Sequence, residues 1–186
     1  MSNVIIKKSL PPIQEITSMS FEKQLHPMLI EQQTKAWQQF FEQYPESAQN
    51  LSKQKLADFK LLITLSDFAL RSALQAPELV IGLFDSGNIY QTELPLYQEL
   101  IDSKLLACDS EEQLHQALRR FRLQQMVKIA FADLVMNISL DQSLLRLSNL
   151  ADAVILSTVD WLSQFCYQKW GTPVNKYGKV QPCLLY

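Results

Sequence analysis

The sequence predicts an all-α fold, a helical bundle of about five to six helices. Only four of the 186 residues are glycine, against a usual share of roughly 7%, which disfavours the turn-rich sandwiches and barrels. Hydrophobic residues recur at helical spacing over most of the chain, and serine or proline stands where several of these periodic segments begin. Helices are therefore expected to supply the core.

Composition restricts the class of protein further. Hydrophobic residues make up 47% of the chain and charged residues 19%, with a formal net charge of −2. Such a balance is typical of a folded domain and provides no overall field that attracts nucleic acid or an anionic membrane. No apolar run approaches the roughly 18 residues that a membrane span needs, and Val4-Ile5-Ile6 is too short for a signal-peptide core. The three cysteines form no CxxC pair, which favours reduced thiols and a cytoplasmic location.

Four helices are expected in the first part of the chain. Their bounds are predicted from proline and serine residues, because proline fits the first turn of a helix and serine caps its N-terminus. The expected segments are a mobile arm over residues 1–20, helices from Pro27 to before Pro45, from Ser52 to before Pro77 and from Pro77 to the turn at 85–88, and a segment from Thr92 or Glu93 to Leu105 with Pro95 near its start.

Two long helices are expected after residue 110. Ser110 and Gln113 form a capping-box pattern that begins a helix reaching about Met136. Its apolar face changes side along its length, so its two ends are expected to pack on different neighbours. The first face comprises Leu114, Ala117, Leu118 and Phe121, and the second comprises Leu123, Met126, Val127, Ala130 and Leu134.

The helix expected from Asp141 to Trp170 carries the clearest apolar stripe. The short link 137–140 requires an antiparallel hairpin with the preceding helix. We expect Ile155 and Leu162 to be buried within this pair. The stripe comprises Leu144, Leu147, Ala151, Val154, Ile155, Thr158, Leu162, Phe165 and Cys166, and the opposite side comprises Arg146, Asn149, Ala153, Asp160 and Gln164.

The segment 172–186 has a different character. Gly171 is placed to end the preceding helix, and a turn is expected at Tyr177-Gly178. The terminal residues Cys183 to Tyr186 are typical of the start of a strand. This segment is therefore interpreted as a linker leading into a sheet.

Catalytic and metal-ligating patterns are weak in this sequence. The four glycines are scattered, so no phosphate-binding loop is predicted. Asp133, Asp152 and Asp160 are interpreted as solvated helix positions rather than a carboxylate set, because no D-x-D pair presents two side chains together. His115 and Cys108 lack a visible activating partner, and the three tryptophans are interpreted as core anchors. The sequence predicts no catalytic, cofactor-binding or metal residue.

One row on the helix that begins after Ser110 is a candidate contact surface. Arg119, Arg122, Met126 and Asp133 fall within a sector of roughly 60° on a helical wheel. Arginine suits bidentate oxyanion contacts, so the row is a candidate for an interface or anion contact. An ordinary solvated flank remains the alternative.

Four segments carry a resemblance to a known family. They read LRRFRLQQMVKIAFADL from Leu118, then LSNLADAVILSTVDWL, then WGTP, then QPCLLY. Together they resemble the N-terminal half of the bacterial bifunctional glutamine synthetase adenylyltransferase/adenylyl-removing enzymes. The chain departs from the family pattern by carrying Gln125 for glutamate, Lys128 for arginine, Phe131 for tryptophan and Ala132 for arginine.

The resemblance implies a role in controlling glutamine synthetase. Such enzymes remove AMP from a tyrosine by phosphorolysis in one half and add it in the other, using Mg²⁺ and ATP or ADP. By resemblance, residues 21–171 are the helical N-terminal subdomain of the adenylyl-removing half, and 172–186 lead into the strand of a missing nucleotidyltransferase domain.

The implied partners are glutamine synthetase, the PII signalling protein and the enzyme's own catalytic domain, without nucleic acid or membrane. The fragment is expected to be inert alone and to hold no cofactor. The alternative is a stand-alone helical interaction module that has lost catalysis.

Overall fold

The computed structural model describes residues 27–180. The expected mobile arm over 1–20 and the expected strand from Cys183 lie outside the described residues. The helices in chain order are α2 (Pro27–Gln43), α3 (Lys53–Leu65), α4 (Asp67–Gln75), α5 (Pro77–Asp85), the 3₁₀ turn η1 (Asn88–Tyr90), α6 (Tyr97–Leu105), α7 (Glu111–Leu134) and α8 (Leu140–Trp170).

The predicted all-α class is confirmed. Between residues 27 and 180 the only β-type pairing is an isolated antiparallel bridge between Val174 and Val180. The chain turns between them at Gly178, whose φ of 75° lies in the left-handed region that favours glycine. No helix in the described part of the chain is long and apolar enough to cross a membrane.

The helix expected to run from Ser52 to Pro77 is in fact two helices, divided at Ser66. The backbone of Ser66 is extended (φ −139°, ψ 108°), and its N–H donates to the Leu62 carbonyl at 3.0 Å, which ends α3. Its Oγ accepts from the Ala69 N–H at 3.1 Å, which caps α4. The expectation of one continuous helix was therefore wrong because a serine here serves both helices. The residues from 27 to 180 thus contain seven α-helices.

The helix expected to begin at Thr92 or Glu93 begins at Tyr97 instead. Pro95 disfavours helical backbone at the residue before it, so the chain stays irregular up to Leu96. We call this irregular segment, residues 91–96, the strap. Its Thr92 carbonyl accepts a hydrogen bond from Arg146 of α8.

Serine caps begin both long helices. Ser110 Oγ accepts from the Gln113 N–H at 3.3 Å, as predicted, but Gln113 Oε1 accepts from the Asp109 N–H at 2.7 Å rather than from Ser110. At α8 the reciprocal box is complete, because Ser139 and Gln142 each bond the other's backbone N–H at 3.3 Å. Gly171 ends α8 as expected, with φ at 81°.

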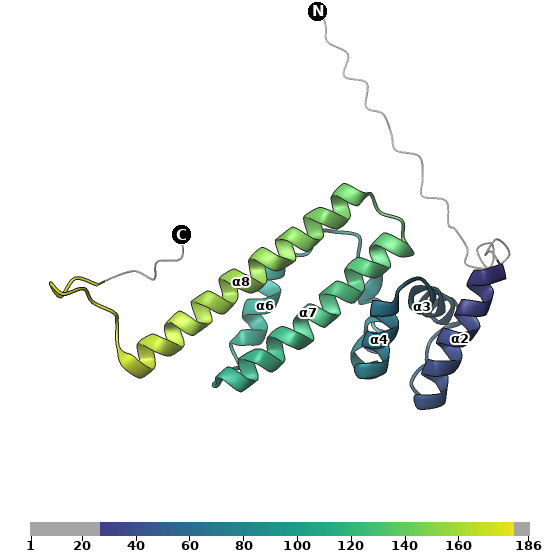
Figure 1. The fold of residues 1–186 in the computed structure, drawn as a ribbon, viewed down its shortest axis with the longest axis horizontal. Helices are drawn as coiled ribbons and strands as arrows, with labels where there is room; N and C mark the ends of the chain where they lie inside the picture. Colours follow the sequence, from purple (N-terminus) through teal and green to yellow (C-terminus); the bar gives the residue numbers. More distant parts are fainter. Residues whose placement is uncertain (1–26, 181–186) are drawn as a thin grey trace, which may run out of the picture.

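Helices α7 and α8 form the predicted antiparallel hairpin (Figure 1). They are the longest helices that the structure describes, with 24 and 31 residues. The link turns at Asn137, whose φ of 54° is tolerated by asparagine better than by most residues. The Ile138 N–H donates to the Ala132 carbonyl at 3.1 Å, which closes the turn.

Two hydrophobic clusters meet along α7, as the change of its apolar face predicts. The first cluster contains residues of α2, α3, α4, α5 and η1 together with the later part of α7. It includes an edge-to-face series of rings with successive centroids 5.0, 5.4 and 5.5 Å apart: Phe40, Phe59, Phe84 and Phe131. The second joins α6, α7 and α8: Tyr97, Ile101, Leu105, Leu114, Phe121, Ile129, Leu150 and Ala153. Figure 1 shows α7 extending from one group of helices to the other.

Candidate functional site

Helix α8 packs on α6 and α7 through the side that lies opposite the predicted apolar stripe. Five of its residues are buried: Ser143, Arg146, Leu150, Ala153 and Ser157. Serine and alanine are small, so they let the α8 backbone approach α6 closely. Arg146 and Ala153, which the sequence places opposite the apolar stripe, are therefore on the buried side of the helix.

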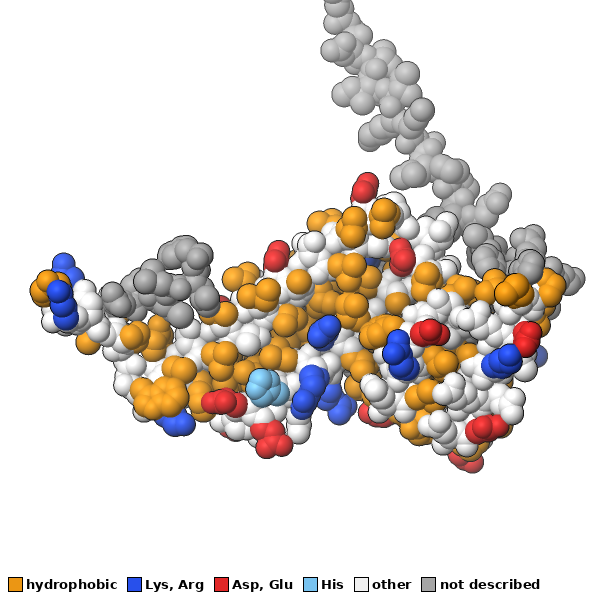
Figure 2. Space-filling view, viewed as in Figure 1, with side chains coloured by type: hydrophobic (Ala, Val, Ile, Leu, Met, Phe, Trp, Pro, Cys, Tyr) orange, Lys and Arg blue, Asp and Glu red, His pale blue; other side chains and the backbone are white. Residues whose placement is uncertain are grey.

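The predicted apolar stripe of α8 is exposed over much of its length, whereas its members Val154 and Phe165 are half-buried. Ile155 is 60% exposed and Leu162 is 36% exposed, so the prediction that both are buried was also wrong. We call the exposed large hydrophobics on this side the α8 apolar face: Leu140, Leu144, Leu147, Ile155 and Leu162. Figure 2 shows hydrophobic side chains gathered over α8.

This face has the chemistry of a docking surface. Its members recur at three-, four-, seven- and eight-residue intervals and so form one line along the helix. Contiguous apolar surface of this kind marks an interaction site more often than scattered single residues do. The sequence predicted the apolar stripe. It did not predict that no element between residues 27 and 180 covers the α8 apolar face.

The candidate row on α7 is only partly free. Arg119 and Arg122 are exposed, and neither makes an ion pair within residues 27–180. Met126 is half-buried against the second cluster. Asp133 Oδ1 accepts a 2.6 Å hydrogen bond from Ser143 Oγ, so this carboxylate joins α7 to α8. The contact of the two arginines with an anion or another domain stays a prediction.

A polar group whose members the sequence did not bring together lies where α7, α8 and the strap before α6 meet. Arg146 is 6% exposed and donates from Nη2 to the Thr92 carbonyl. Lys128 Nζ donates to Gln91 Oε1 at 2.8 Å. No carboxylate pairs with either cation among the described residues. The buried Gln125 Oε1 has no hydrogen-bond partner in the same part of the chain.

Burial shifts the pKa values of Lys128 and of the neighbouring Tyr97. Burial first, and then the Arg146 charge, lower the pKa of Lys128 from 10.5. Burial raises the pKa of Tyr97 above 10.0, while the charge and hydrogen bond of Arg146 oppose that shift. The sequence placed Arg146 opposite the apolar stripe, together with Asn149 and Asp160, so it gave no signal that this arginine is buried.

The other candidate residues lie apart. Asp152 and Asp160 are exposed on α8, and His115 is exposed on α7. Residues 27–180 contain no group of three or more His, Cys, Asp or Glu side chains that could hold a metal ion. Trp37 and Trp161 pack against the two clusters, whereas Trp170 is 68% exposed, so its expected role as a core anchor was wrong.

Comparison with known proteins places this sequence in a family. The sequence profile described as glutamate-ammonia ligase adenylyltransferase matches residues 56–185, which include all of α7 and α8. The chain belongs to this family. The proteins it resembles are called bifunctional glutamine synthetase adenylyltransferase/adenylyl-removing enzymes. Identity is 32% over 163 residues with that of Shewanella oneidensis, 33% over 150 with that of Shewanella loihica and 31% over 163 with that of Shewanella woodyi.

The alignments cover most of this chain and a small part of each adenylyltransferase. They take in 88%, 80% and 88% of the chain, but only 17%, 16% and 17% of the three relatives in the same order. No solved structure gives a significant match. The α8 apolar face therefore belongs to a segment that represents about a sixth of these relatives.

Proposed function

We propose that this chain is a helical support for the catalytic domain of an enzyme that controls glutamine synthetase through AMP on a tyrosine. The observation that carries the proposal is the α8 apolar face, which is exposed along a 31-residue helix. Family membership supports the enzyme class. The chain spans 17% of the length of the Shewanella oneidensis relative.

The occupant proposed for the α8 apolar face is the nucleotidyltransferase domain of the same polypeptide. Full burial of a leucine or isoleucine stabilises by about 1.5–3 kcal/mol, and covering these side chains, which are 36–70% exposed, would contribute part of that amount at each position. The segment after Gly171 leaves directly from the end of α8, the helix that carries this face. Arg119 and Arg122 are proposed to contact the same domain or its bound nucleotide.

The half of the enzyme proposed to be supported is the adenylyl-removing one. In that reaction inorganic phosphate attacks the phosphorus of the tyrosyl-AMP bond, releasing ADP and the free tyrosine hydroxyl. The described residues show neither a glycine-rich phosphate loop nor a carboxylate group for Mg²⁺, so no step of this chemistry is assigned to them. Nucleotide and Mg²⁺ are proposed to bind the catalytic domain, with glutamine synthetase and the PII protein as cytoplasmic partners.

A chimera tests the proposal. The aligned segment of the Shewanella oneidensis enzyme is replaced by this chain, and AMP removal and AMP addition are assayed separately on glutamine synthetase. We expect both activities to be retained in the chimera. Ile155→Asp in the chimera should reduce phosphate-dependent AMP removal at least tenfold, because a charge on the α8 apolar face cannot be buried without a partner. AMP addition should change much less.

The matched control is Ile30→Asp on α2, an isoleucine that is 47% exposed and lies outside the region matched by the family profile. It should leave AMP removal unchanged. Equal loss from both substitutions, or no loss from Ile155→Asp, would contradict the proposal. Loss of addition rather than removal would assign the chain to the other half of the enzyme.

A further inference from the structure

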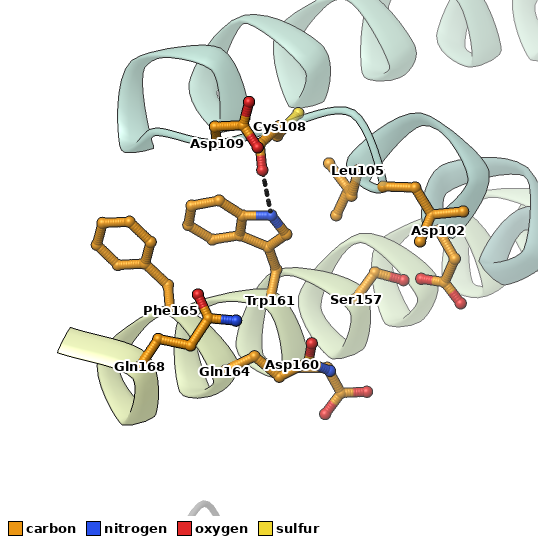
Figure 3. Close-up of a pocket in the computed structure, with 11 residues that line it drawn as sticks. Asp102, Leu105, Cys108, Asp109, Ser157, Asp160, Trp161, Gln164, Phe165 and Gln168 are labelled. Carbon is orange, nitrogen blue, oxygen red and sulfur yellow. Dashed lines mark hydrogen bonds between the residues drawn. The ribbon is translucent and has the colours of Figure 1, made fainter. Parts of the chain in front are cut away.

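A groove opens where α8 continues past the end of α6. It has a volume of ≈ 630 Å³. Figure 3 shows its walls, formed by α8 on one side and by the end of α6 and the α6–α7 connection on the other. Its lining includes Asp102, Leu105, Cys108, Asp109, Ser157, Asp160, Trp161, Gln164, Phe165 and Gln168.

The inner side of α8 becomes polar along this groove. Up to Ala153 that side packs on its neighbours through buried residues. Helical spacing then places Asp160, Gln164 and Gln168 in line with Ser157, and all four line the groove. Ile155 and Ser157 are separated by roughly 200° around the helix, so the groove and the α8 apolar face are different surfaces.

The groove is acidic. Its carboxylates come from three segments, with Asp102 on α6, Asp109 on the α6–α7 connection and Asp160 on α8. No Lys, Arg or His lines it. This combination favours a cation over an anion.

A buried hydroxyl supplies a second, independent indication of a ligand. Ser157 is 2% exposed, and its Oγ has no hydrogen-bond partner within the described residues. In Figure 3 this hydroxyl points toward the side of the groove that carries Asp102. A buried polar group without a partner is unfavourable, so a donor brought in by a ligand would relieve that cost.

An aromatic wall completes the groove. Trp161 Nε1 donates to the Cys108 carbonyl at 3.3 Å, which fixes the indole. Phe165 stacks on it with ring centroids 5.0 Å apart and planes 14° apart. Lys169 Nζ lies 5.8 Å from the Phe165 centroid and nearer, at 4.7 Å, to that of Trp170. A planar cation can stack against such a surface.

We propose that this groove binds the guanidinium group of an arginine side chain carried by a peptide segment. Guanidinium offers five N–H donors in one plane, so it can pair with a carboxylate and the Ser157 hydroxyl while its flat face lies against the aromatic wall. A metal ion does not fit, since the carboxylates do not form a metal-binding group in the described structure. The site is a separate property from the proposed docking of the catalytic domain on the α8 apolar face.

Titration of the complete chain followed by the tryptophan indole N–H signals in NMR tests the proposal. The Trp161 signal is assigned from Trp161→Phe, and the probe is N-acetylarginine amide. We expect a saturable shift of this signal and weaker binding of N-acetyllysine amide. Asp160→Asn should weaken binding of the arginine probe at least threefold. Asp152→Asn, eight residues earlier on α8 and outside the groove, should leave it unchanged.

Ser157→Ala separates binding from folding. Removing an unpaired buried hydroxyl should maintain or raise the melting temperature, yet weaken binding of the arginine probe by roughly tenfold, because the ligand loses a charge-assisted hydrogen bond. A capped Ala-Arg-Ala peptide that binds more tightly than agmatine would confirm a peptide as the source, whereas equal affinities would indicate a free small guanidinium compound. No saturable Trp161 shift, or equal binding of the lysine probe, would overturn the proposal.

Discussion

Ser143 Oγ on α8 donates a 2.6 Å hydrogen bond to Asp133 Oδ1 on α7, and this bond ties the two helices together beside their hairpin turn. Both residues are at least partly buried, and Ser143 is 5% exposed. A hydrogen bond to a charged acceptor in such a place contributes more than a neutral one on the surface. The carboxylate that the sequence grouped with two arginines thus has a structural role in the hairpin.

Asp133→Ala should reduce the free energy of unfolding by about 1–3 kcal/mol, because the Ser143 hydroxyl is left buried and unpaired. Urea denaturation of the complete chain measures this. Asp152→Ala, at an exposed position of α8, is the matched control and should change stability by less than about 0.5 kcal/mol. Equal effects of the two substitutions would mean that the Asp133–Ser143 bond contributes nothing.

The Tyr90 hydroxyl donates to Asp58 Oδ2 at 2.8 Å, joining η1 to α3. Burial first, and then the hydrogen bond and charge of Asp58, raise the pKa of Tyr90 well above 10.0. A tyrosine with a raised folded-state pKa contributes stability that is fully present below its unfolded pKa and is lost as the pH rises toward the folded value.

Tyr90→Phe should therefore cost about 1.5–3 kcal/mol near neutral pH, the usual range for a hydrogen bond to a charged group. The difference in unfolding free energy between the wild-type chain and the variant should stay constant up to about pH 10, the ordinary tyrosine pKa, and shrink above it. Urea denaturation between pH 7 and pH 11 follows this difference. A difference that grows above pH 10 would contradict the Tyr90–Asp58 assignment.

Two leucines of α8 should respond oppositely to truncation. Leu150 is 4% exposed and belongs to the second cluster, so Leu150→Ala should cost about 2–5 kcal/mol. Leu162 lies on the α8 apolar face, so Leu162→Ala should cost less than about 1 kcal/mol in this chain. Thermal and urea unfolding of both variants measure the contrast. A larger loss at Leu162 would show that the face is covered in the chain itself.

The cation pair between α7 and α8 gives a spectroscopic prediction. Burial is the larger cause of the lowered Lys128 pKa and the Arg146 charge is the smaller. Arg146→Met keeps a long apolar side chain and removes the charge, so the pKa of Lys128 should rise but stay below 10.5. Carbon-13 NMR of the Lys128 Cε resonance during a pH titration reports it. An unchanged titration would show that the two cations do not interact.

Local signals in the sequence were sufficient for most of the helices. Ser110 and Gly171 bound the two long helices as their capping chemistry predicts, and the change of apolar face along α7 correctly predicts two packing environments. The break at Ser66 was missed because serine inside an apolar period is compatible with either a continuous helix or a cap.

The side of α8 that is buried could not be predicted from the sequence, for a different reason. An apolar stripe indicates that a face is suited to burial but does not identify the element that covers it. Small residues such as Ala153 and Ser157 pack on α6, while Ile155 stays exposed. The groove beside Trp161 was missed as well, because its carboxylates come from segments that only the tertiary fold brings together.

Cysteine labelling at the centre of the α8 apolar face tests the central claim most directly. Ile155→Cys is introduced with the three native cysteines replaced by serine, both in this chain and in the Shewanella oneidensis chimera. Asp67→Cys on the exposed side of α4 serves as the control for accessibility. The account predicts rapid thiol labelling at position 155 in the chain alone and at least tenfold slower labelling in the chimera, with position 67 equally reactive in both. Equal labelling of position 155 in the two proteins would contradict the claim that the catalytic domain covers this face.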